Sequence, residues 1–233
     1  MLTLTWHGHA TWAIEFAGKR IVVDPFFDQN PAATAKASEL DCDLILVTHG
    51  HADHIADAAP IALRTKAMVV SVYEIAEWLG KQGVTSVTGM NLGGSFHLPY
   101  CSIKMVPAWH SSTLPDGSNG GVPAGFVLTL GGKRIYIAGD TAFFSDMTLI
   151  GQMEIEVAIL PIGDLYTMGI DDSVLATQAI NPRFVLPSHF NTWPPIAQDT
   201  KAWAHKIKSE TPAEPIVLTP GEAHQFASFK AAH

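Results

Sequence analysis

Apolar and polar residues alternate along the first part of the chain, which is the pattern of half-buried β-strands. The alternation covers residues 2–6 and is repeated at residues 12–16. Gly18-Lys19 then provides a turn into the apolar run at residues 21–23. The N-terminal segment is therefore predicted to form a β-meander of three strands.

Beyond residue 30, short apolar runs alternate with segments whose apolar residues recur at helical spacing. One predicted helix follows a capping box formed by Ser71 and Glu74. Another ends before Asn181-Pro182, and a third is opened by Pro194-Pro195. Buried strands are predicted at residues 44–47, 69–70, 103–106, 157–160 and 184–186, and a hairpin joins residues 126–130 to 135–138.

This order of elements indicates an α/β (α+β) protein in which two mixed sheets pack together with helices outside. The same succession occurs twice, so we expect a single domain, residues 1–233, with two similar halves at about 1–105 and 106–233. Hydrophobic residues make up 47% of the chain and charged residues 15%. That composition supports a large core and excludes an intrinsically disordered protein.

The charge balance narrows the classes of function. Lys and Arg number 14 against 22 Asp and Glu, which gives a formal charge of −8. Binding to nucleic acids or anionic membranes needs a broad basic surface, so neither partner is expected. The two cysteines, Cys42 and Cys101, exclude a disulfide scaffold and a four-cysteine zinc site. Without a signal-peptide pattern or an apolar run of ~18 residues, a cytoplasmic protein is expected.

The segment HGHADH, residues 49–54, carries the strongest chemical signal. It places three imidazoles and a carboxylate within six residues, and these are donors that Zn²⁺, Mn²⁺ and Fe ions take. His49 and His51 are two positions apart, so they point the same way in extended backbone. Asp53 and His54 follow after a turn, which lets one loop divide its donors between two adjacent ions.

Further ionisable residues follow predicted strands at the point where each apolar run ends. The ends of neighbouring strands meet at one edge of a sheet, where ligand sites are commonly built. We therefore expect these residues to converge with the histidine motif on one site. They are Asp24, His110, Asp140, Asp164 and His189.

The HGHADH motif, followed by His110, by Asp140 within Gly139-Asp140-Thr141 and by His189, resembles the metallo-β-lactamase superfamily. Three further segments narrow the resemblance: WHGHAT at residues 6–11, Asp24-Pro25 and PGE at residues 220–222. They are similar to small, largely uncharacterised metal-dependent hydrolases near the sugar-lactonase (ascorbate-6-phosphate lactonase-like) branch. The resemblance implies a four-layer αββα sandwich with a two-metal site at one edge.

The resemblance also implies two divalent metal ions, for which Zn²⁺ is most suitable and Mn²⁺ or Fe also suit. A hydroxide bridging ions about 3.5–4 Å apart would attack an ester, lactone, amide or phosphoester of a small substrate. Asp53 and Asp140 are the expected catalytic residues, with Asp53 orienting the hydroxide and accepting a proton. The implied ligands are His49, His51 and His110 for the first ion, Asp53, His54 and His189 for the second, and Asp140 bridging both.

Four weaker candidates each have a purely structural alternative. His9 either contacts the metals or substrate or is a structural residue bonded to backbone. Asp24 either orients a ligand imidazole or forms a turn. Asp164 and Tyr166 lie in a loop that either lines a substrate pocket or packs ordinarily, and the loop at residues 111–125 is either a flap or plain surface. Histidines without partners at metal spacing are expected to be structural or exposed: His97, His205, His224 and His233.

Two other functions stay open beside the small-substrate hydrolase. One is a phosphodiesterase acting on nucleotide or phospholipid-like substrates, and the other is a non-catalytic metal-binding protein. Structural zinc sites are closed by four protein ligands, whereas seven donors shared by two ions leave positions for water. The pattern therefore favours an enzyme with a small-molecule substrate. The pattern does not identify the substrate or the oligomeric state, and a homo-oligomer is one of the alternatives.

Overall fold

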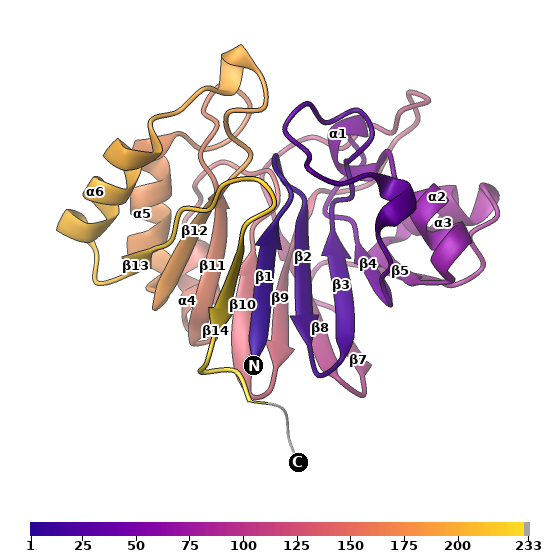
Figure 1. Ribbon diagram of the computed structural model, residues 1–233, viewed down its shortest axis with the longest axis horizontal. Coiled ribbons are helices and arrows are strands. Elements are labelled where there is room, and N and C mark those ends of the chain that lie inside the picture. The colour runs from indigo at the N-terminus through magenta and orange to yellow at the C-terminus, as the bar shows by residue number, and fades with distance from the viewer. Residues whose placement is uncertain (231–233) are drawn as a thin grey trace.

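The computed structural model describes residues 1–230, which form two seven-stranded sheets with helices on their outer sides (Figure 1). The first sheet consists, in spatial order, of β14 (Ala223–Phe226), β1 (Leu2–Trp6), β2 (Trp12–Phe16), β3 (Lys19–Val23), β4 (Leu44–Leu46), β5 (Met68–Val72) and β6 (Val87–Met90). The second consists of β13 (Glu214–Pro215), β12 (Phe184–Ser188), β11 (Ile155–Pro161), β10 (Lys133–Ile137), β9 (Ala124–Leu130), β8 (Cys101–Pro107) and β7 (Ser95–Leu98).

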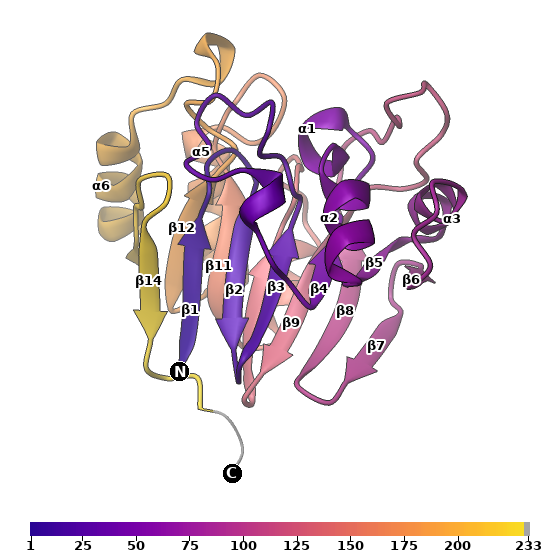
Figure 2. The same cartoon turned by 45° about the vertical axis from the view of Figure 1, so that its right-hand side comes forward.

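The helices complete the outer layers. Helix α3 packs on β5 and β6, and α5 packs on β11. Figure 2 shows α2 and α3 on one flank and α5 and α6 on the other, with both sheets between them. The expected four-layer αββα sandwich is thus confirmed. The helices are α1 (Ala52–Ile55), α2 (Ala58–Thr65), α3 (Tyr73–Lys81), α4 (Met147–Gly151), α5 (Ile170–Ile180) and α6 (Thr200–Glu210), with 3₁₀ turns η1 (Ala37–Glu39) and η2 (Pro194–Ile196).

Both sheets use the same order of strand pairings. β14, β1, β2 and β3 are antiparallel neighbours, and the pairings from β3 through β6 are parallel. In the second sheet β7, β8, β9 and β10 are antiparallel and the pairings from β10 through β13 are parallel. The chain passes from the first sheet to the second between Met90 and Ser95, whereas the boundary between the two similar halves was expected at about residue 105. Strand β14 then returns to the first sheet beside β1.

The central strands are buried on both faces because each sheet lies between the other sheet and a layer of helices. Every residue of β4 and of β11 is buried. Strand β1 instead alternates, with Leu2, Leu4 and Trp6 buried and the intervening threonines partly exposed. The alternation predicted from the sequence therefore sets which face of the meander meets the core.

Two helices begin differently from the prediction. Ser71 lies in β5 and donates its buried hydroxyl to the Val47 carbonyl at 2.7 Å, so it does not cap α3. Helix α6 is capped by Asp199, whose carboxylate accepts backbone N–H groups of the first turn at 2.9 and 3.0 Å. Pro194-Pro195 open only η2. In both cases a polar side chain bonds to a backbone group that the sequence spacing alone did not identify.

Seven strands that are followed by predicted site residues direct their carboxyl ends to the same edge of the sandwich. Strands β1, β3 and β4 are mutually parallel in the first sheet, and β8, β10, β11 and β12 are mutually parallel in the second. This edge lies beside α1 and away from the N-terminus (Figure 1). The loops after these strands carry the predicted site residues.

Candidate metal centre

His49, His51 and His110, which the superfamily resemblance implies as ligands of one ion, form a first group of donors. One nitrogen of each lies within 4.8 Å of those of the other two. Their ring centroids are 4.6 to 5.0 Å apart, and the ring planes are nearly perpendicular. His49 is fully buried, whereas His51 and His110 keep partly exposed surface. Three imidazoles facing a common point with one side open are typical of a catalytic rather than a closed metal site.

Asp53, His54 and His189 form a second group, and His9 lies beside them. The Oδ2 atom of Asp53 is 3.7 Å from His189 Nε2 and 3.8 Å from His54 Nε2. Asp53 and His54 belong to α1, which begins directly after His51. That helical turn separates them from the first group, although all come from one short segment.

Asp140 lies between the two groups. Its Oδ2 atom is 3.1 Å from His189 Nε2 and 3.3 Å from His54 Nε2. The same oxygen is 3.7 Å from His110 Nε2 and 3.9 Å from His49 Nε2. One buried carboxylate thus faces imidazoles of both groups.

Asp24 connects the two groups through a hydrogen-bond chain that includes Thr48. One carboxylate oxygen accepts the Nδ1–H of His54 at 2.8 Å and the Thr48 hydroxyl at 2.6 Å. Because that hydroxyl proton is directed to Asp24, the Thr48 oxygen accepts the Nδ1–H of His49 at 3.0 Å. Both imidazoles therefore turn Nε2 toward the site. Sequence reasoning missed Thr48, whose only signal is its place directly before His49.

His9 holds Asp53 from the opposite side. Its Nε2–H donates to Asp53 Oδ2 at 2.9 Å, and its Nδ1 accepts the Thr192 hydroxyl at 2.9 Å. A carboxylate only accepts, which fixes the His9 proton on Nε2. Burial lowers the pKa of His9 to about 4, so the ring is a neutral donor at pH 7. Thr192, three residues after His189, is a second contact that the sequence did not indicate.

The charges of the site do not balance without added cations. Within the described residues, the only cationic partners within 4 Å of Asp24, Asp53 and Asp140 are histidines. Burial by itself lowers the pKa of His54, but Asp140 and the other carboxylates outweigh it and raise that pKa well above its ordinary value. The same balance raises the pKa of His189 to about 9. Without metal, the site thus retains protons that a divalent cation would replace.

Buried polar atoms without a partner test whether a metal fits. Within residues 1–230, three of the proposed ligands carry a buried atom without a hydrogen-bond partner: His54 Nε2, Asp140 Oδ1 and His189 Nδ1. An unsatisfied buried polar atom costs about 1–3 kcal/mol, which a coordinate bond would offset. Imidazole nitrogens and carboxylate oxygens are the donors that zinc takes. The residues present therefore fit divalent cations at this edge.

The other candidates lie outside the donor groups. Asp164 and Tyr166 are exposed and belong to neither group. Asp164 shapes a turn, with φ of 65° and its N–H donating to the Met168 carbonyl at 3.0 Å. His97 bonds to Ser102 at an exposed position. His205 and His224 also stand apart from the donor groups, and His233 is outside the described residues.

The segment between β8 and β9 is tied to the histidine motif. The Ser112 hydroxyl accepts the Gly50 N–H at 3.0 Å, and Ser111 Oγ lies 3.3 Å from His51 Nε2. Leu114 is buried and anchors the same segment. These contacts place the loop beside the first donor group, while a flap movement stays a prediction.

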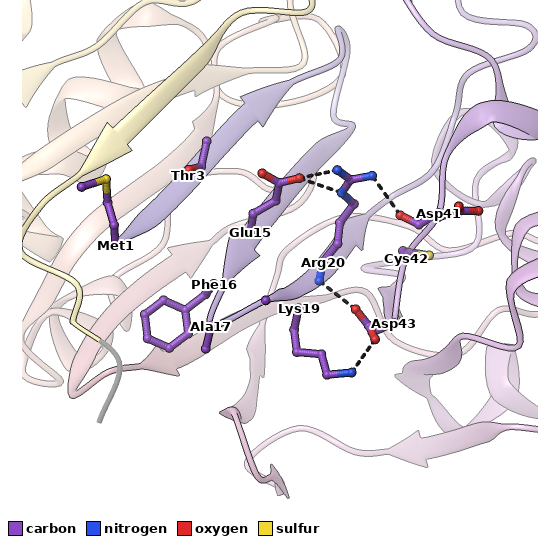
Figure 3. A pocket seen from close by; sticks show the side chains of 11 residues that line it. Met1, Thr3, Glu15, Phe16, Ala17, Lys19, Arg20, Asp41, Cys42 and Asp43 are labelled. Carbon is purple, nitrogen blue, oxygen red and sulfur yellow. Dashed lines mark hydrogen bonds and ion pairs between the residues drawn. The ribbon is translucent and has the colours of Figure 1, made fainter. Parts of the chain in front are cut away.

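A depression of about 530 Å³ lies at the opposite end of the first sheet, around the start of β1 and the β2–β3 turn (Figure 3). Its cations are neutralised locally. Lys19 pairs with Asp43 at 2.7 Å, and Arg20 Nε donates to Glu15 at 2.8 Å. Among the described residues, its side-chain charges are paired and it contains none of the metal donor groups, so this depression is not a candidate catalytic site.

Comparison with known proteins agrees with the geometry. The family described as "Beta-lactamase superfamily domain" matches residues 3–189. The chain belongs to this superfamily. A metal-dependent hydrolase of Thermus thermophilus is 48% identical over 223 residues, covering 95% of this chain and 98% of that protein. One of Methanopyrus kandleri is 41% identical over 229 residues, covering 96% and 100%.

A solved structure extends the superfamily assignment to three dimensions. The metallo hydrolase from the hyperthermophilic archaeon Ignicoccus hospitalis matches with a TM-score of 0.87 and 38% identity, over 97% of this chain and 99% of that one. The chain is accordingly a metal-dependent hydrolase of the β-lactamase superfamily. None of the helices described here has the length and apolar character needed to cross a membrane.

Proposed function

We propose that the chain binds two divalent cations, with zinc the best match, and hydrolyses an ester, lactone, amide or phosphoester of a small molecule. Zinc suits the proposal because five of the seven donors are imidazoles. The acidic chain disfavours nucleic acid as substrate. The proposed ligands are His49, His51 and His110 for one ion, Asp53, His54 and His189 for the other, and Asp140 between them.

The position of Asp140 carries the proposal. A carboxylate that bound a single structural ion would be expected to face the imidazoles of one group only. Asp140 Oδ2 lies 3.1 to 3.9 Å from imidazole nitrogens of both. Two ions, when bound, supply an activated water and polarise the substrate oxygen.

The protein contributes orientation and one proton acceptor. The hydrogen bonds from His49 and His54 to Thr48 and Asp24 keep both rings turned toward the ions. Asp53 has 28% of its side chain exposed, against 3% for Asp140 and 1% for Asp24. Its Oδ2 is engaged by His9, so Oδ1 is the oxygen left to accept a proton from water that enters the site.

The test combines metal content with hydrolysis. Elemental analysis of the wild-type protein is expected to give two ions per chain, and the metal-loaded protein to cleave p-nitrophenyl acetate, a γ-lactone or bis-p-nitrophenyl phosphate. Chelation should abolish the activity. The Asp140→Asn variant should lose one ion and most activity at neutral pH, with partial recovery at alkaline pH or in excess metal, because two cations would share less negative charge.

Asp172→Asn is the matched control, since it changes an exposed carboxylate in the first turn of α5. It should retain both ions and full activity. An Asp140→Asn variant with unchanged metal content and an unshifted pH profile would show that Asp140 does not lie between two ions. Full metal content without cleavage of any of the three bonds would contradict the proposed reaction.

A further inference from the structure

An apolar groove of about 550 Å³ adjoins the first donor group. His110 forms part of its wall, so the groove and the donors share one imidazole. No charged side chain lines it among the described residues. The lining consists of Leu92, Pro107, Ala108, Trp109, His110, Val122, Pro123 and Ala142.

Trp109 dominates this groove. With 68% of its surface exposed, it is the most exposed large apolar side chain in the described part of the chain, and Leu92 and Val122 add two further exposed groups. Exposed apolar groups gathered in one place mark a binding surface more often than scattered ones do. Its indole lies nearly parallel to the ring of Phe144, with 6.4 Å between centroids and 20° between planes, and most of its surface stays exposed.

The backbone links Trp109 to the segment that carries Asp140. The Trp109 N–H donates to the Thr141 hydroxyl at 2.9 Å, and the Ala142 N–H donates to the Trp109 carbonyl at 3.1 Å. The groove is therefore fixed relative to the donors. A group lying on the indole has a set position with respect to the site.

The open side of the site borders the groove at His110. Among the seven donors, only His51, Asp53 and His110 keep partly exposed surface, and the other four are buried. Substrate must enter past these three, and His110 is the one that also borders the groove. The part of the substrate extending beyond His110 then meets apolar side chains and no cation.

From these observations we propose that the groove binds the apolar acyl or aryl part of an uncharged substrate whose scissile ester or lactone bond lies at the donors. The inference rests on the proposed function and narrows it from any small molecule to an apolar carboxylic ester. A free carboxylate or phosphate at the same position would find no partner in the groove.

A chain-length series tests the inference on the metal-loaded protein. For p-nitrophenyl acetate, butyrate, hexanoate and octanoate, kcat/KM should rise by about twofold per methylene. Full burial of a methylene corresponds to about fourfold, and one face of a chain in an open groove stays in water. In Trp109→Ala the octanoate-to-acetate ratio should fall roughly tenfold, because the indole supplies the largest apolar contact.

Binding gives a second readout that needs no turnover. In saturation-transfer NMR, octan-1-ol should receive magnetisation from wild-type protein more strongly than butan-1-ol does, and Trp109→Ala should remove the difference. Leu149→Ala is the control, because Leu149 is 54% exposed on α4 outside the groove. That variant should keep both the ester ratio and the alcohol binding. Trp109 is a surface side chain, so the variant should also melt as the wild type does.

The outcomes separate this inference from the proposed function. Equal kcat/KM values for all four esters would contradict the inference that the groove binds the acyl part, and would leave the proposed hydrolysis in place. Octan-1-ol binding that depends on Trp109, without hydrolysis of any ester, would uphold an apolar ligand site and remove the proposed reaction. If Trp109→Ala converts a dimer to a monomer and leaves the ester ratio unchanged, the groove is a contact between copies and the inference fails.

Discussion

Asp24 shows how one buried residue sets the direction of two imidazoles. It is 1% exposed and has a φ of 46°, a left-handed conformation that a non-glycine residue adopts at a cost. Its carboxylate accepts from Thr48 and His54, and Thr48 in turn holds His49. A backbone strain of this kind persists where the surrounding bonds fix it, commonly at functional sites.

This chain of hydrogen bonds predicts different effects on metal affinity for substitutions of Asp24 and of Thr48. Asp24→Asn removes the charge that holds His54 and weakens the anchor of Thr48, so affinity should fall about 10- to 100-fold for both ions. Thr48→Val keeps the shape but removes the hydroxyl that bonds to His49 and to Asp24, while the bond from His54 to Asp24 remains, so the ion held by His49 should be the one that binds more weakly. Competition of each variant with a fluorescent chelator measures both steps. Two unchanged affinities in Thr48→Val would contradict the proposed orientation of His49.

The same residues show what a sequence reveals at this scale. The seven proposed ligands could be nominated from the sequence because imidazoles and carboxylates that follow strands match the pattern of a known superfamily. Thr48 and Thr192 could not, since threonine is common and its hydroxyl matters here only through contacts with His49 and His9. Asp164 also follows a strand, three residues after the end of β11, but its turn leaves it exposed. A position shortly after a strand does not by itself predict whether a side chain faces the site.

At the scale of elements, the strand-end turns position the donors. Gly139 joins β10 to Asp140 with a φ of 64°. A Cβ placed there would lie 2.9 Å from Thr48 Cβ and 3.0 Å from its hydroxyl oxygen. The turn after β10 therefore packs against the turn after β4, and that packing brings Asp140 of one sheet to the histidine motif of the other.

Two glycine variants isolate this close approach. Gly132→Ala changes a turn glycine with φ of 79° that has open space around its Cβ position, so it should cost only about 1 kcal/mol of unfolding free energy. Gly139→Ala bears the same strain and also displaces Thr48, so it should cost roughly 1–3 kcal/mol more and weaken metal binding. Urea denaturation and metal titration of both variants provide the comparison. Equal losses would show that the contact with Thr48 is not tight.

Elements with a buried face were predictable, and those without one were not. β1, β2 and β11 follow from alternation or from a continuous apolar run. β6 and β7 were missed because they lie at sheet edges, where most of their residues are partly or fully exposed and no apolar period develops. β13 has two residues, which is too short for any pattern.

At the scale of the whole molecule, the fold and the site have separate sources of stability. The core between the sheets is formed by buried strands such as β4 and β11, which contribute no donor side chain. The donors lie in turns at one edge. Removal of metal should therefore leave the sandwich folded, unlike a zinc finger, whose structure depends on its ion. What changes is the charge balance at that edge.

This charge balance predicts an optimum in the stability of the metal-free protein near pH 7. His9, with a pKa lowered by burial to about 4, contributes stability that is present above its unfolded pKa of about 6.5 and lost as pH falls toward 4. His189, with a pKa raised to about 9, contributes stability that is full below about 6.5 and lost as pH rises through 9. The loss on the alkaline side should be on the order of 3 kcal/mol.

Metal should remove the alkaline loss, because the ions take the place of the protons on His54 and His189. Urea midpoints at pH 5, 7 and 9, measured with chelator and with excess zinc, should therefore diverge most at pH 9. In His189→Gln the chelated protein should lose much of its decline between pH 7 and 9, since the group that releases the proton is gone. A chelated wild-type protein that became steadily more stable from pH 7 to 9 would show that these imidazoles do not retain protons for the carboxylates. The inference that cations replace those protons would then fail.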